Sequence, residues 1–368
     1  MNIVMLCDWL PPDFGAVGQY AQQFARQLAE AGNQVCLVGF SSQERAQTVA
    51  VTAQGSLTVR YVPMPSYDRS ALLQRALWTV KANVALVWAA RYELSLADEV
   101  RFTGSPPYLL HFLAPLRQIL AVRMRYRITD FHPECLIAAK GSRPEWLKII
   151  ERLTWFWRRQ IDVIEVIGTD QMRRLLDGGI PADRIELLRD PSPVQFDGKQ
   201  TRAPLPSALQ GRKVVLYSGN WGVAHDHETF AVGMSLLEKK YPGFAGVWLN
   251  ATGARADQAE LGLRAVGVTV ARTPPCPLAD LPAVLLAADV HLITLADAFV
   301  GYVLPSKVYA CIESGRPVLF VGSAESDVHA LCADGVADGR YRRVAVGDYQ
   351  AICSALESLL LPQPELGS

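Results

Sequence analysis

The chain has 368 residues, of which 50% are hydrophobic and 20% are charged, with 36 basic and 36 acidic residues. This length predicts two globular domains, and the balanced charge argues against nucleic acid as a partner. The seven cysteines are scattered without a Cys-x-x-Cys pair, which predicts free thiols and neither a zinc site nor a disulfide framework. We expect a cytoplasmic protein, because the sequence has no recognisable signal peptide and no apolar segment of about 18 residues.

The first residues predict the start of a parallel α/β sheet. Ile3 to Cys7 form an apolar strand, a loop with Gly15 and Gly18 follows, and then come a helix and the strand Gln34 to Gly39. In such sheets, ligands bind at the loops that follow the carboxyl ends of the strands, and glycine lets a ligand approach the backbone closely. The glycine spacing does not match the dinucleotide fingerprint G-x-G-x-x-G, so we expect no nicotinamide or flavin cofactor.

A polar cluster stands out in the first half of the chain. Asp130-Phe-His-Pro-Glu134 follows Tyr126 to Thr129, which is a candidate strand. A histidine between two carboxylates at the end of a strand suits a general acid, a general base or a ligand for sugar hydroxyls. His132 is therefore a candidate catalytic residue, and Asp130 and Glu134 are candidates for binding an acceptor. The alternative is a helix start, with Asp130 as its cap and His132 on the surface.

An aromatic and basic helix is predicted from Trp146 to Arg159. Its wide apolar face comprises Trp146, Ile149, Ile150, Leu153, Phe156 and Trp157. The basic residues that flank this face are Lys148, Arg152, Arg158 and Arg159. Such a helix can lie on an anionic membrane surface. The alternative is that the apolar face packs on the sheet of its own domain while the arginines cover the rim.

The alternation of strands and helices then starts again. The last strand of the first half is expected at Ile161 to Ile167, and the proline-rich stretch from Pro181 to Pro206 contains the domain boundary. We place this boundary near residue 198, which gives domains 1–197 and 198–368. The predicted fold class is α/β, with two Rossmann-like parallel sheets whose carboxyl edges face each other across a cleft.

The segment from Gly301 to Val318 predicts a site for an anion. Pro305 suits the first position of a helix, and apolar residues recur at helical spacing after it. Ser306 and Lys307 would then lie in the first turn, where unpaired backbone N–H groups and the charge of the lysine favour a phosphate. The alternative is an ordinary helix of an α/β layer.

Several of these motifs resemble those of the retaining glycosyltransferases of family 4, which have the GT-B fold of two Rossmann-like domains. In the second half, the matching stretches are Tyr217 to His225, Asp280 to Val290, Leu304 to Tyr309 and Ser314 to Val318. In the first half, they are Pro11 to Gly15, Gly104 to Pro107 and Asp130 to Glu134. The resemblance implies an acceptor-side first domain and a second domain that binds a nucleotide sugar. It also implies that the last helix can cross back to the first domain.

The resemblance also implies roles for individual residues. His132 and Lys307 would be catalytic, with His132 contacting the transferred sugar or the leaving group. The implied donor-binding residues are Gly15, Asn220, His225, Gly301, Ser306 and Lys307. The family often has two glutamates eight positions apart, and these positions are Tyr302 and Ala310 here. Ala310 therefore lacks the carboxylate that would bind the nucleotide ribose.

The implied function is retaining transfer of a sugar from a nucleotide-diphosphate sugar to a glycan or lipid-linked glycan in polysaccharide biosynthesis. The donor is expected to be UDP-linked rather than GDP-linked, with no cofactor and no metal, and the protein is expected at the inner face of the membrane. His225-Asp-His-Glu228 reads as a possible metal cluster, but we expect it to start a helix. The alternatives are a non-catalytic GT-B scaffold, which Tyr302 and Ala310 favour, and a nucleotide-sugar epimerase on the same fold.

Overall fold

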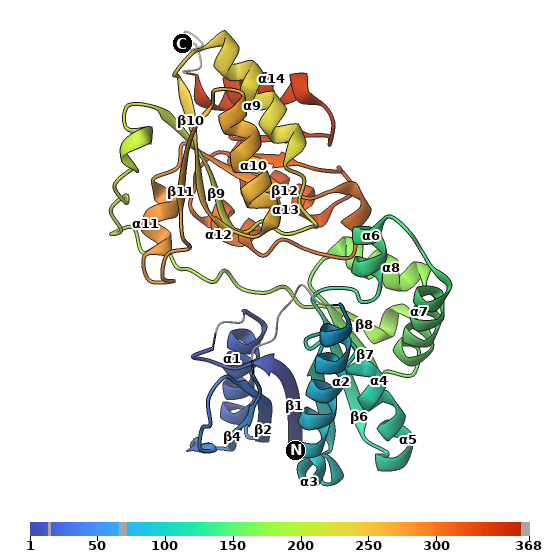
Figure 1. Cartoon of the computed structure of the whole chain (residues 1–368). Coiled ribbons are helices and arrows are strands. Elements are labelled where there is room, and N and C mark those ends of the chain that lie inside the picture. The colour runs from blue at the N-terminus through green and yellow to red at the C-terminus, as the bar shows by residue number, and fades with distance from the viewer. Residues whose placement is uncertain (14–15, 66–71, 362–368) are drawn as a thin grey trace. The chain divides into compact units, whose positions relative to one another are not determined.

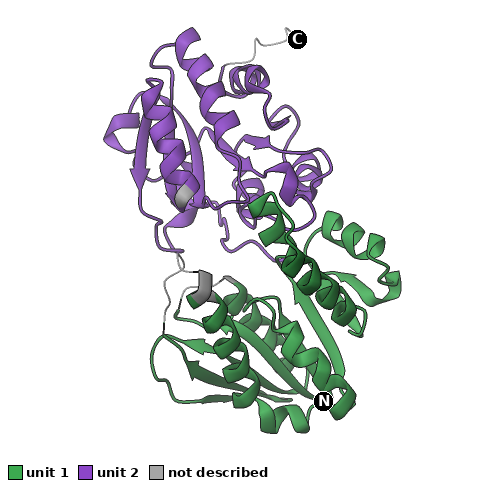
Figure 2. Cartoon of the chain, turned by 45° about the vertical axis from the view of Figure 1, so that its right-hand side comes forward, with its two compact units in different colours: residues 1–189 green, residues 190–368 purple. Residues whose placement is uncertain are grey.

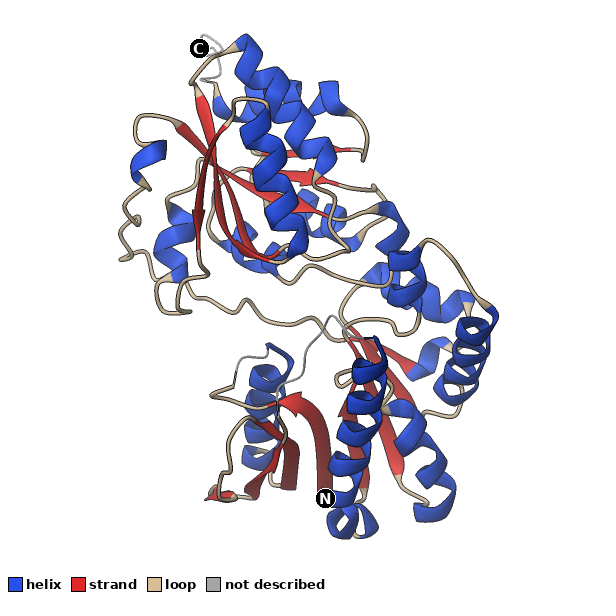
Figure 3. Cartoon of the chain, in the orientation of Figure 1, coloured by secondary structure: helices blue, strands red, loops and turns tan. Residues whose placement is uncertain are grey.

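The chain forms two compact units, residues 1–189 and residues 190–368, in the computed structural model (Figure 2). The structure describes residues 1–13, 16–65 and 72–361. Each unit is a sheet with helices packed on it (Figure 3), so the predicted α/β class with two sheets is confirmed. The sequence-based boundary near residue 198 lies a short way inside the second unit.

The first unit contains an eight-stranded sheet of order β3-β4-β2-β1-β5-β6-β7-β8. Its strands are β1 Asn2–Trp9, β2 Gln34–Ser41, β3 Thr48–Val51, β4 Ser56–Pro63, β5 Glu99–Thr103, β6 Arg123–Ile128, β7 Val163–Val166 and β8 Ile185–Leu187. Its helices are α1 Ala16–Glu30, α2 Leu72–Ala89, α3 Arg91–Ser95, α4 Leu110–Leu113, α5 Arg117–Leu120, α6 Glu134–Lys140, α7 Glu145–Arg158 and α8 Thr169–Asp177. Two short 3₁₀ helices are η1 Ala114–Leu116 and η2 Ala182–Arg184. All strand pairs are parallel except β3 with β4, which is antiparallel.

The predicted strand, loop, helix and strand at the start of the chain are β1, α1 and β2 (Figure 1). Ala21, Ala25 and Ala29 are buried, and this small-residue stripe lets α1 lie close to β1 and β2. The helical segment from Leu110 to Leu120 is divided into α4, η1 and α5, because Pro115 cannot donate the hydrogen bond that a continuous helix needs. The prediction of the last strand was wrong, since β8 follows β7 in the sheet.

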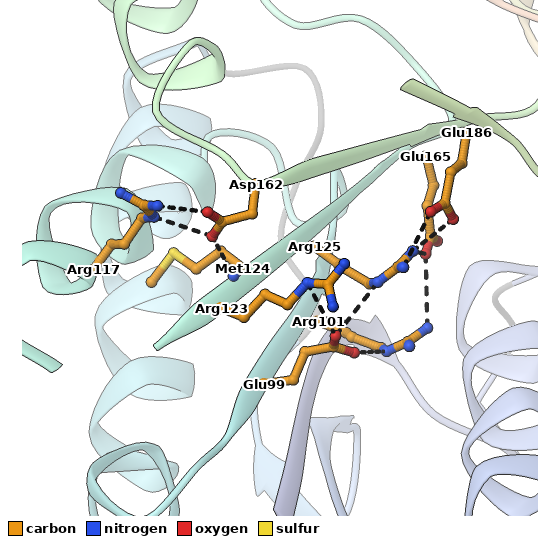
Figure 4. A network of polar contacts seen from close by, with 9 residues as sticks. All are labelled: Glu99, Arg101, Arg117, Arg123, Met124, Arg125, Asp162, Glu165 and Glu186. Carbon is orange, nitrogen blue, oxygen red and sulfur yellow. Dashed lines mark hydrogen bonds and ion pairs between the residues drawn. The ribbon is translucent and has the colours of Figure 1, made fainter. Parts of the chain in front are cut away.

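A network of charged side chains runs across β5 to β8 (Figure 4). Arg123, Arg125 and Arg127 alternate along β6 with the buried residues Met124, Tyr126 and Ile128, so the arginines share one face of the sheet. Arg125 lies 3.1 Å from Glu165 and 3.4 Å from Glu99. Opposite charges on neighbouring strands stabilise the sheet, which explains a polar pattern that the sequence left unassigned.

The second unit contains a six-stranded parallel sheet of order β11-β10-β9-β12-β13-β14. Its strands are β9 Lys213–Asn220, β10 Ala245–Thr252, β11 Thr269–Thr273, β12 Val290–Thr294, β13 Val318–Val321 and β14 Tyr341–Val344. Its α-helices are α9 Glu228–Lys240, α10 Ala254–Ala265, α11 Leu281–Leu286, α12 Lys307–Glu313, α13 Asp327–Gly335 and α14 Tyr349–Leu360. Two 3₁₀ helices are η3 Ser207–Leu209 and η4 Asp297–Phe299.

The predicted alternation of strands and helices is present in this half, and β10 is followed almost directly by α10. We expected that the last helix could cross back to the first unit; instead, α14 packs against α9 and β14 in the second unit. A Cβ atom at Gly233 would lie 2.3 Å from Cβ of Ile352, so only glycine allows α9 to approach α14 this closely. Trp221, Phe230 and Leu356 join the core between these helices and the sheet.

Candidate functional site

The side chain of Lys307 is buried at the carboxyl edge of the second sheet. Lys307 begins α12, and its Nζ atom lies 3.2 Å from the centre of the Tyr217 ring on β9. This nitrogen is covered by protein and has no hydrogen-bond partner among the described residues, although the residue as a whole keeps some exposure. Burial lowers the pKa of the Lys307 amine to about 7. A buried amine without a hydrogen-bond partner gains free energy when it binds a polar or anionic ligand group.

His225 and Thr294 complete the surroundings of this amine. The Nδ1 atom of His225 lies 2.5 Å from the backbone oxygen of Thr294, at the end of β12, so Nδ1 is the protonated nitrogen. Burial, together with the charge of Lys307, lowers the pKa of His225 to about 3, and the ring is neutral at pH 7. The hydroxyl of Thr294 is also buried without a partner among the described residues. We call Tyr217, Gly219, His225, Thr294 and Lys307 the Lys307 cluster.

Gly219 lies beside the lysine near the end of β9. Its φ angle is 112°, and a Cβ atom there would lie 3.8 Å from Cε of Lys307. Asn220 is exposed at the last position of β9, and Ser306 is exposed at the cap of α12. Gly301 is buried in the loop before α12, with a φ angle of 77°. Of the predicted donor-binding residues, the structure thus brings His225 next to Lys307, whereas Gly15 lies outside the described residues.

The helix itself is shorter than the sequence suggests. α12 begins at Lys307 rather than Pro305 and has seven residues, so its dipole is a weaker argument for an anion than the amine. Ala310 is 4% exposed and packs in the core with Leu216 and Leu285. Glu313 is exposed on the last turn. No carboxylate of α12 therefore takes the place of the family's second glutamate.

His132 lies at the carboxyl edge of the first sheet, in the loop between β6 and α6. Its ring is half-buried and 6.2 Å from the ring of Tyr108, centre to centre. Tyr108 has a φ angle of 70°, a conformation that side chains rarely adopt and that is common at binding and catalytic sites. Asp130 is exposed beside this loop. His132 is thus partly accessible, as an acceptor-side role requires, whereas burial of the Asp130 carboxyl raises the pKa of Asp130 to about 6.

The structure contradicts the predicted acceptor role of Glu134. Glu134 is buried and forms a bidentate ion pair with Arg158 of α7, which is 0% exposed. The guanidinium of Arg158 lies between the rings of Phe131 and Trp155, at 4.8 and 4.9 Å, and donates to the backbone oxygen of His132 at 3.1 Å. Glu134 therefore holds Arg158, which fixes the loop of His132, and it is not available to a ligand.

The alternative for α7, in which its wide apolar face packs on the sheet of its own domain, does not hold in the structure. α7 buries Leu147, Thr154 and Arg158, whereas most of the predicted apolar face points to solvent. A second helix has the same property: α2 exposes a stripe of large apolar side chains. The exposed apolar residues are Leu77, Val80, Val84 and Trp88 on α2 and Trp146, Ile149, Leu153 and Phe156 on α7. Both helices pack against α4, and we call these eight side chains the apolar helix face.

Neither a membrane-spanning helix nor a metal centre is found in the described parts of the chain. None of the helices in residues 1–13, 16–65 and 72–361 combines the length and the apolar character that crossing a membrane requires. Over the same residues, no three His, Cys, Asp or Glu side chains converge as a metal site would need. Asp226 instead accepts a hydrogen bond from the backbone N–H of Thr229 at the start of α9, as expected for a helix start.

Sequence reasoning missed Tyr217 and Thr294 as parts of the site. Tyr217 is buried in β9, and Thr294 is the last residue of β12. β9 and β12 are adjacent parallel strands, so their carboxyl ends reach the same edge. A polar residue that closes an apolar strand, as Thr294 does after Val290 to Ile293, is the signal that could have pointed to this edge.

The chain is similar in sequence to two bacterial proteins, although no protein-family model matches it. One is WcaI of Escherichia coli strain K12, assigned as a glycosyl transferase of colanic acid biosynthesis, at 23% identity over 87% of this chain and 83% of WcaI. The other is WbjE of Pseudomonas aeruginosa, assigned as a glycosyltransferase, at 25% identity over 73% of this chain and 68% of WbjE.

Solved structures show the same fold. WaaG, a glycosyltransferase involved in lipopolysaccharide biosynthesis, superposes with a TM-score of 0.61 at 14% identity, covering 97% of this chain and 90% of WaaG. Alr3699/HepE of Anabaena, solved in complex with UDP and glucose, gives a TM-score of 0.63 at 12% identity over 97% and 90% of the two chains. Sequence and fold together identify this chain as a glycosyltransferase with the GT-B fold.

Proposed function

We propose that the chain transfers a sugar, with retention and without a metal, from a UDP-linked donor to a glycan or lipid-linked glycan, as a family 4-type enzyme. The observation that carries this proposal is the buried amine of Lys307, which has no hydrogen-bond partner among the described residues. The amine lies at the carboxyl edge of a parallel sheet, which is where such sheets bind nucleotides. That Alr3699/HepE was solved with UDP and glucose supports UDP as the nucleotide.

The chemistry follows from the charge that develops on the leaving group. When the bond between the anomeric carbon and the diphosphate breaks, negative charge grows on the phosphate oxygen, and a positioned ammonium stabilises it. Lys307 has a pKa of about 7 in the empty site, and a bound diphosphate would raise it so that the amine is protonated. His225 is neutral and stays so, and its Nε2 atom can accept a hydrogen bond.

The acceptor side belongs to the first unit in this proposal. His132 and Asp130 would contact acceptor or donor hydroxyls, while Arg158 keeps the His132 loop in place through its backbone oxygen. In a retaining reaction the acceptor hydroxyl attacks from the face that the diphosphate leaves. A phosphate oxygen can then take up the proton of that hydroxyl.

We further propose that the apolar helix face binds an anionic membrane surface and brings the enzyme to a lipid-linked acceptor. Trp88 is 67% exposed and Ile149 is 63% exposed, an unusual loss of burial for large apolar side chains. The guanidinium of Arg91 lies 4.4 Å from the centre of the Trp88 ring, and Lys81 and Arg152 are exposed on the same two helical segments. Apolar side chains with flanking cations suit the boundary between acyl chains and acidic headgroups.

Calorimetric titration with UDP and with GDP tests the donor site. We expect UDP to bind the wild type, Lys307→Met to weaken binding by about 1–3 kcal/mol, and Lys239→Met, a change of an exposed lysine on α9, to leave it unchanged. Release of UDP from a panel of UDP-sugars, followed by NMR of the anomeric centre of the product, tests transfer and retention. An absence of binding for both nucleotides at millimolar concentration would reject the donor site.

A specific observation favours a second candidate, a non-catalytic GT-B subunit. Ala310 fills the core position at which the family's ribose-binding glutamate would stand. If this reading is right, Ala310→Glu does not increase UDP affinity, and no sugar leaves any UDP-sugar even at high protein concentration. UDP release that depends on Lys307 would exclude it.

A further inference from the structure

A pocket opens at the amino edge of the second sheet, away from the Lys307 cluster at the carboxyl edge. Its volume is about 230 Å³, and its lining residues are Lys213, Asp289, Arg316, Pro317, Arg340, Leu359 and Leu360. Lys213 begins β9, and Asp289, Arg316 and Arg340 lie one or two residues before β12, β13 and β14. These four strands are neighbours in the sheet, which is why residues far apart in the chain meet here.

Three cationic side chains and one carboxylate line this pocket, and the carboxylate already has partners in the chain. Asp289 accepts a hydrogen bond from the backbone N–H of Val214 at 2.8 Å, and its other oxygen lies 3.4 Å from Nζ of Lys213. Arg340 donates to the backbone oxygen of Gly315 at 3.0 Å. The pocket therefore carries a net positive charge that the surrounding chain does not neutralise.

Arg316 differs from the other two cations of the pocket in its contacts. Its side chain is half-buried, and in the part of the chain that the structure describes its guanidinium makes neither a hydrogen bond nor an ion pair. Burial, together with the like charges of Arg202 and Arg340, lowers the pKa of Arg316, against the opposing effect of Asp289. Holding an unpaired guanidinium beside like charges is unfavourable for the folded chain, and a bound anion would remove that cost.

We propose that this pocket is a second anion site, which binds the phosphate group of a small phosphorylated molecule. Guanidinium groups match the paired oxygens of a phosphate, and Arg316 and Arg340 would supply them together with the ammonium of Lys213. The volume is small for a whole nucleotide but sufficient for a phosphate or diphosphate with water. A bound anion would link the amino ends of β12 to β14 with the end of α14, and would thereby stabilise this unit.

Pyrophosphate is the probe. All measurements use protein that carries Lys307→Met, because this substitution removes the phosphate contact at the donor site. In that background we expect calorimetry to show binding and the unfolding temperature to rise with pyrophosphate. Adding Arg316→Gln should weaken binding at least tenfold and abolish the rise. Arg343→Gln is the matched control, because Arg343 lies on β14 in the same sheet, is not part of the pocket lining and donates to the backbone oxygen of Gly322. Unchanged affinity in Arg316→Gln, or an equal rise with sodium chloride at the same ionic strength, would overturn the proposal.

Stability without any multivalent anion separates binding from a structural role. In a chloride buffer, Arg316→Gln should be at least as stable as its parent, because the change removes repulsion and breaks no contact. A loss of stability there would mean that Arg316 serves the fold and would count against the site. Vesicles of phosphatidylglycerol identify the source of the phosphate when they are tested with a Lys307→Met protein that also carries Trp88→Ser and Ile149→Ser. If these vesicles retain that protein and adding Arg316→Gln abolishes the retention, the ligand is a lipid headgroup. Binding of free pyrophosphate without such retention assigns a soluble ligand.

Discussion

The Nζ atom of Lys307 lies 3.2 Å from the centre of the Tyr217 ring, so the ring face is its nearest favourable contact. A cation over an aromatic ring gains about 1–2 kcal/mol when it is desolvated, which is less than burying an ammonium costs. The amine is therefore held partly neutral at pH 7, with a pKa of about 7. A diphosphate that enters this site supplies the missing charge, and several measurable consequences follow from that.

UDP binding should take up a proton above neutral pH. At pH 8 the amine of free Lys307 is mostly neutral, and bound diphosphate needs it charged, so affinity should fall by up to about tenfold per unit as pH rises from 7 to 9. Titrations in two buffers of different ionisation enthalpy measure the proton directly. Lys307→Arg is always charged, and its affinity should be flat over this range. Equal pH profiles for the two proteins would contradict the role of Lys307.

Replacing Lys307 by methionine should stabilise the empty protein. The pKa of Lys307 falls from 10.5 in the unfolded chain to about 7 in the folded one. Between these values the unfolded chain binds more protons, so stability rises with pH through this window, and the cost of the lysine is complete below pH 7. Lys307→Met removes that cost, and its free energy of unfolding should exceed that of the wild type by about 1–3 kcal/mol at pH 6.

This stability difference should shrink as the pH approaches 10. Cys311 and His225 face the same amine, but both stay neutral near pH 7, because burial raises the pKa of Cys311 to about 12 and lowers that of His225 to about 3. Chemical denaturation at several pH values measures the difference. A wild type that is more stable than Lys307→Met at pH 6 would show that the amine has a partner in the fold.

Glu134→Ala should destabilise the first unit. The change leaves the buried guanidinium of Arg158 without its counter-charge, at a cost of about 3–5 kcal/mol in the free energy of unfolding. Glu134→Ala combined with Arg158→Met should recover most of the loss, since no unpaired charge remains. Glu30→Gln, at an exposed position at the end of α1, is the control, with an expected change below about 0.5 kcal/mol. A stable Glu134→Ala with impaired transfer would restore the acceptor role that the structure contradicts.

Gly219→Ala should destabilise the second unit through its backbone. With φ at 112°, a side chain at this position is strained by about 1–3 kcal/mol, although a Cβ atom would have ordinary contacts with Lys307. Gly222→Ala, in the loop that follows β9 and without a positive φ, should change stability by less. Thermal unfolding compares the two variants. An equal effect of both substitutions would mean that a side chain at Gly219 causes no particular backbone strain.

The apolar helix face should bind anionic vesicles. The wild type should float with vesicles that contain phosphatidylglycerol, and Trp88→Ser combined with Ile149→Ser should remain in the soluble fraction. Val49→Ser and Val51→Ser, which change exposed valines on β3, are the matched control and should leave flotation unchanged. If the Trp88→Ser, Ile149→Ser variant floats as well as the wild type, or if the wild type does not float, this surface is rejected as a membrane-binding site.

Much of the fold and part of the site could be read from local patterns. The buried strand runs, the glycine loops and the proline-rich stretch before β9 gave two α/β units, because burial of both faces of a parallel sheet dictates continuous apolar strands. Lys307 and His225 were candidates from their motifs, and they are neighbours in the structure. β3 and β8 were missed, since three or four residues carry little periodicity, and β4 was missed although it is eight residues long.

The sequence by itself determined most strands of the two sheets and that a lysine follows the loop before α12. Only the tertiary structure decided that Lys307 lies on Tyr217 without a polar partner, and that Arg158 is buried on Glu134 while the apolar side of α7 faces solvent. The same holds for the pocket of Arg316, whose lining comes from the starts of four strands. Periodicity reports which side of a helix is apolar, but packing between distant segments decides which side is covered. The charge of a lysine or an arginine likewise depends on neighbours that the local sequence does not contain.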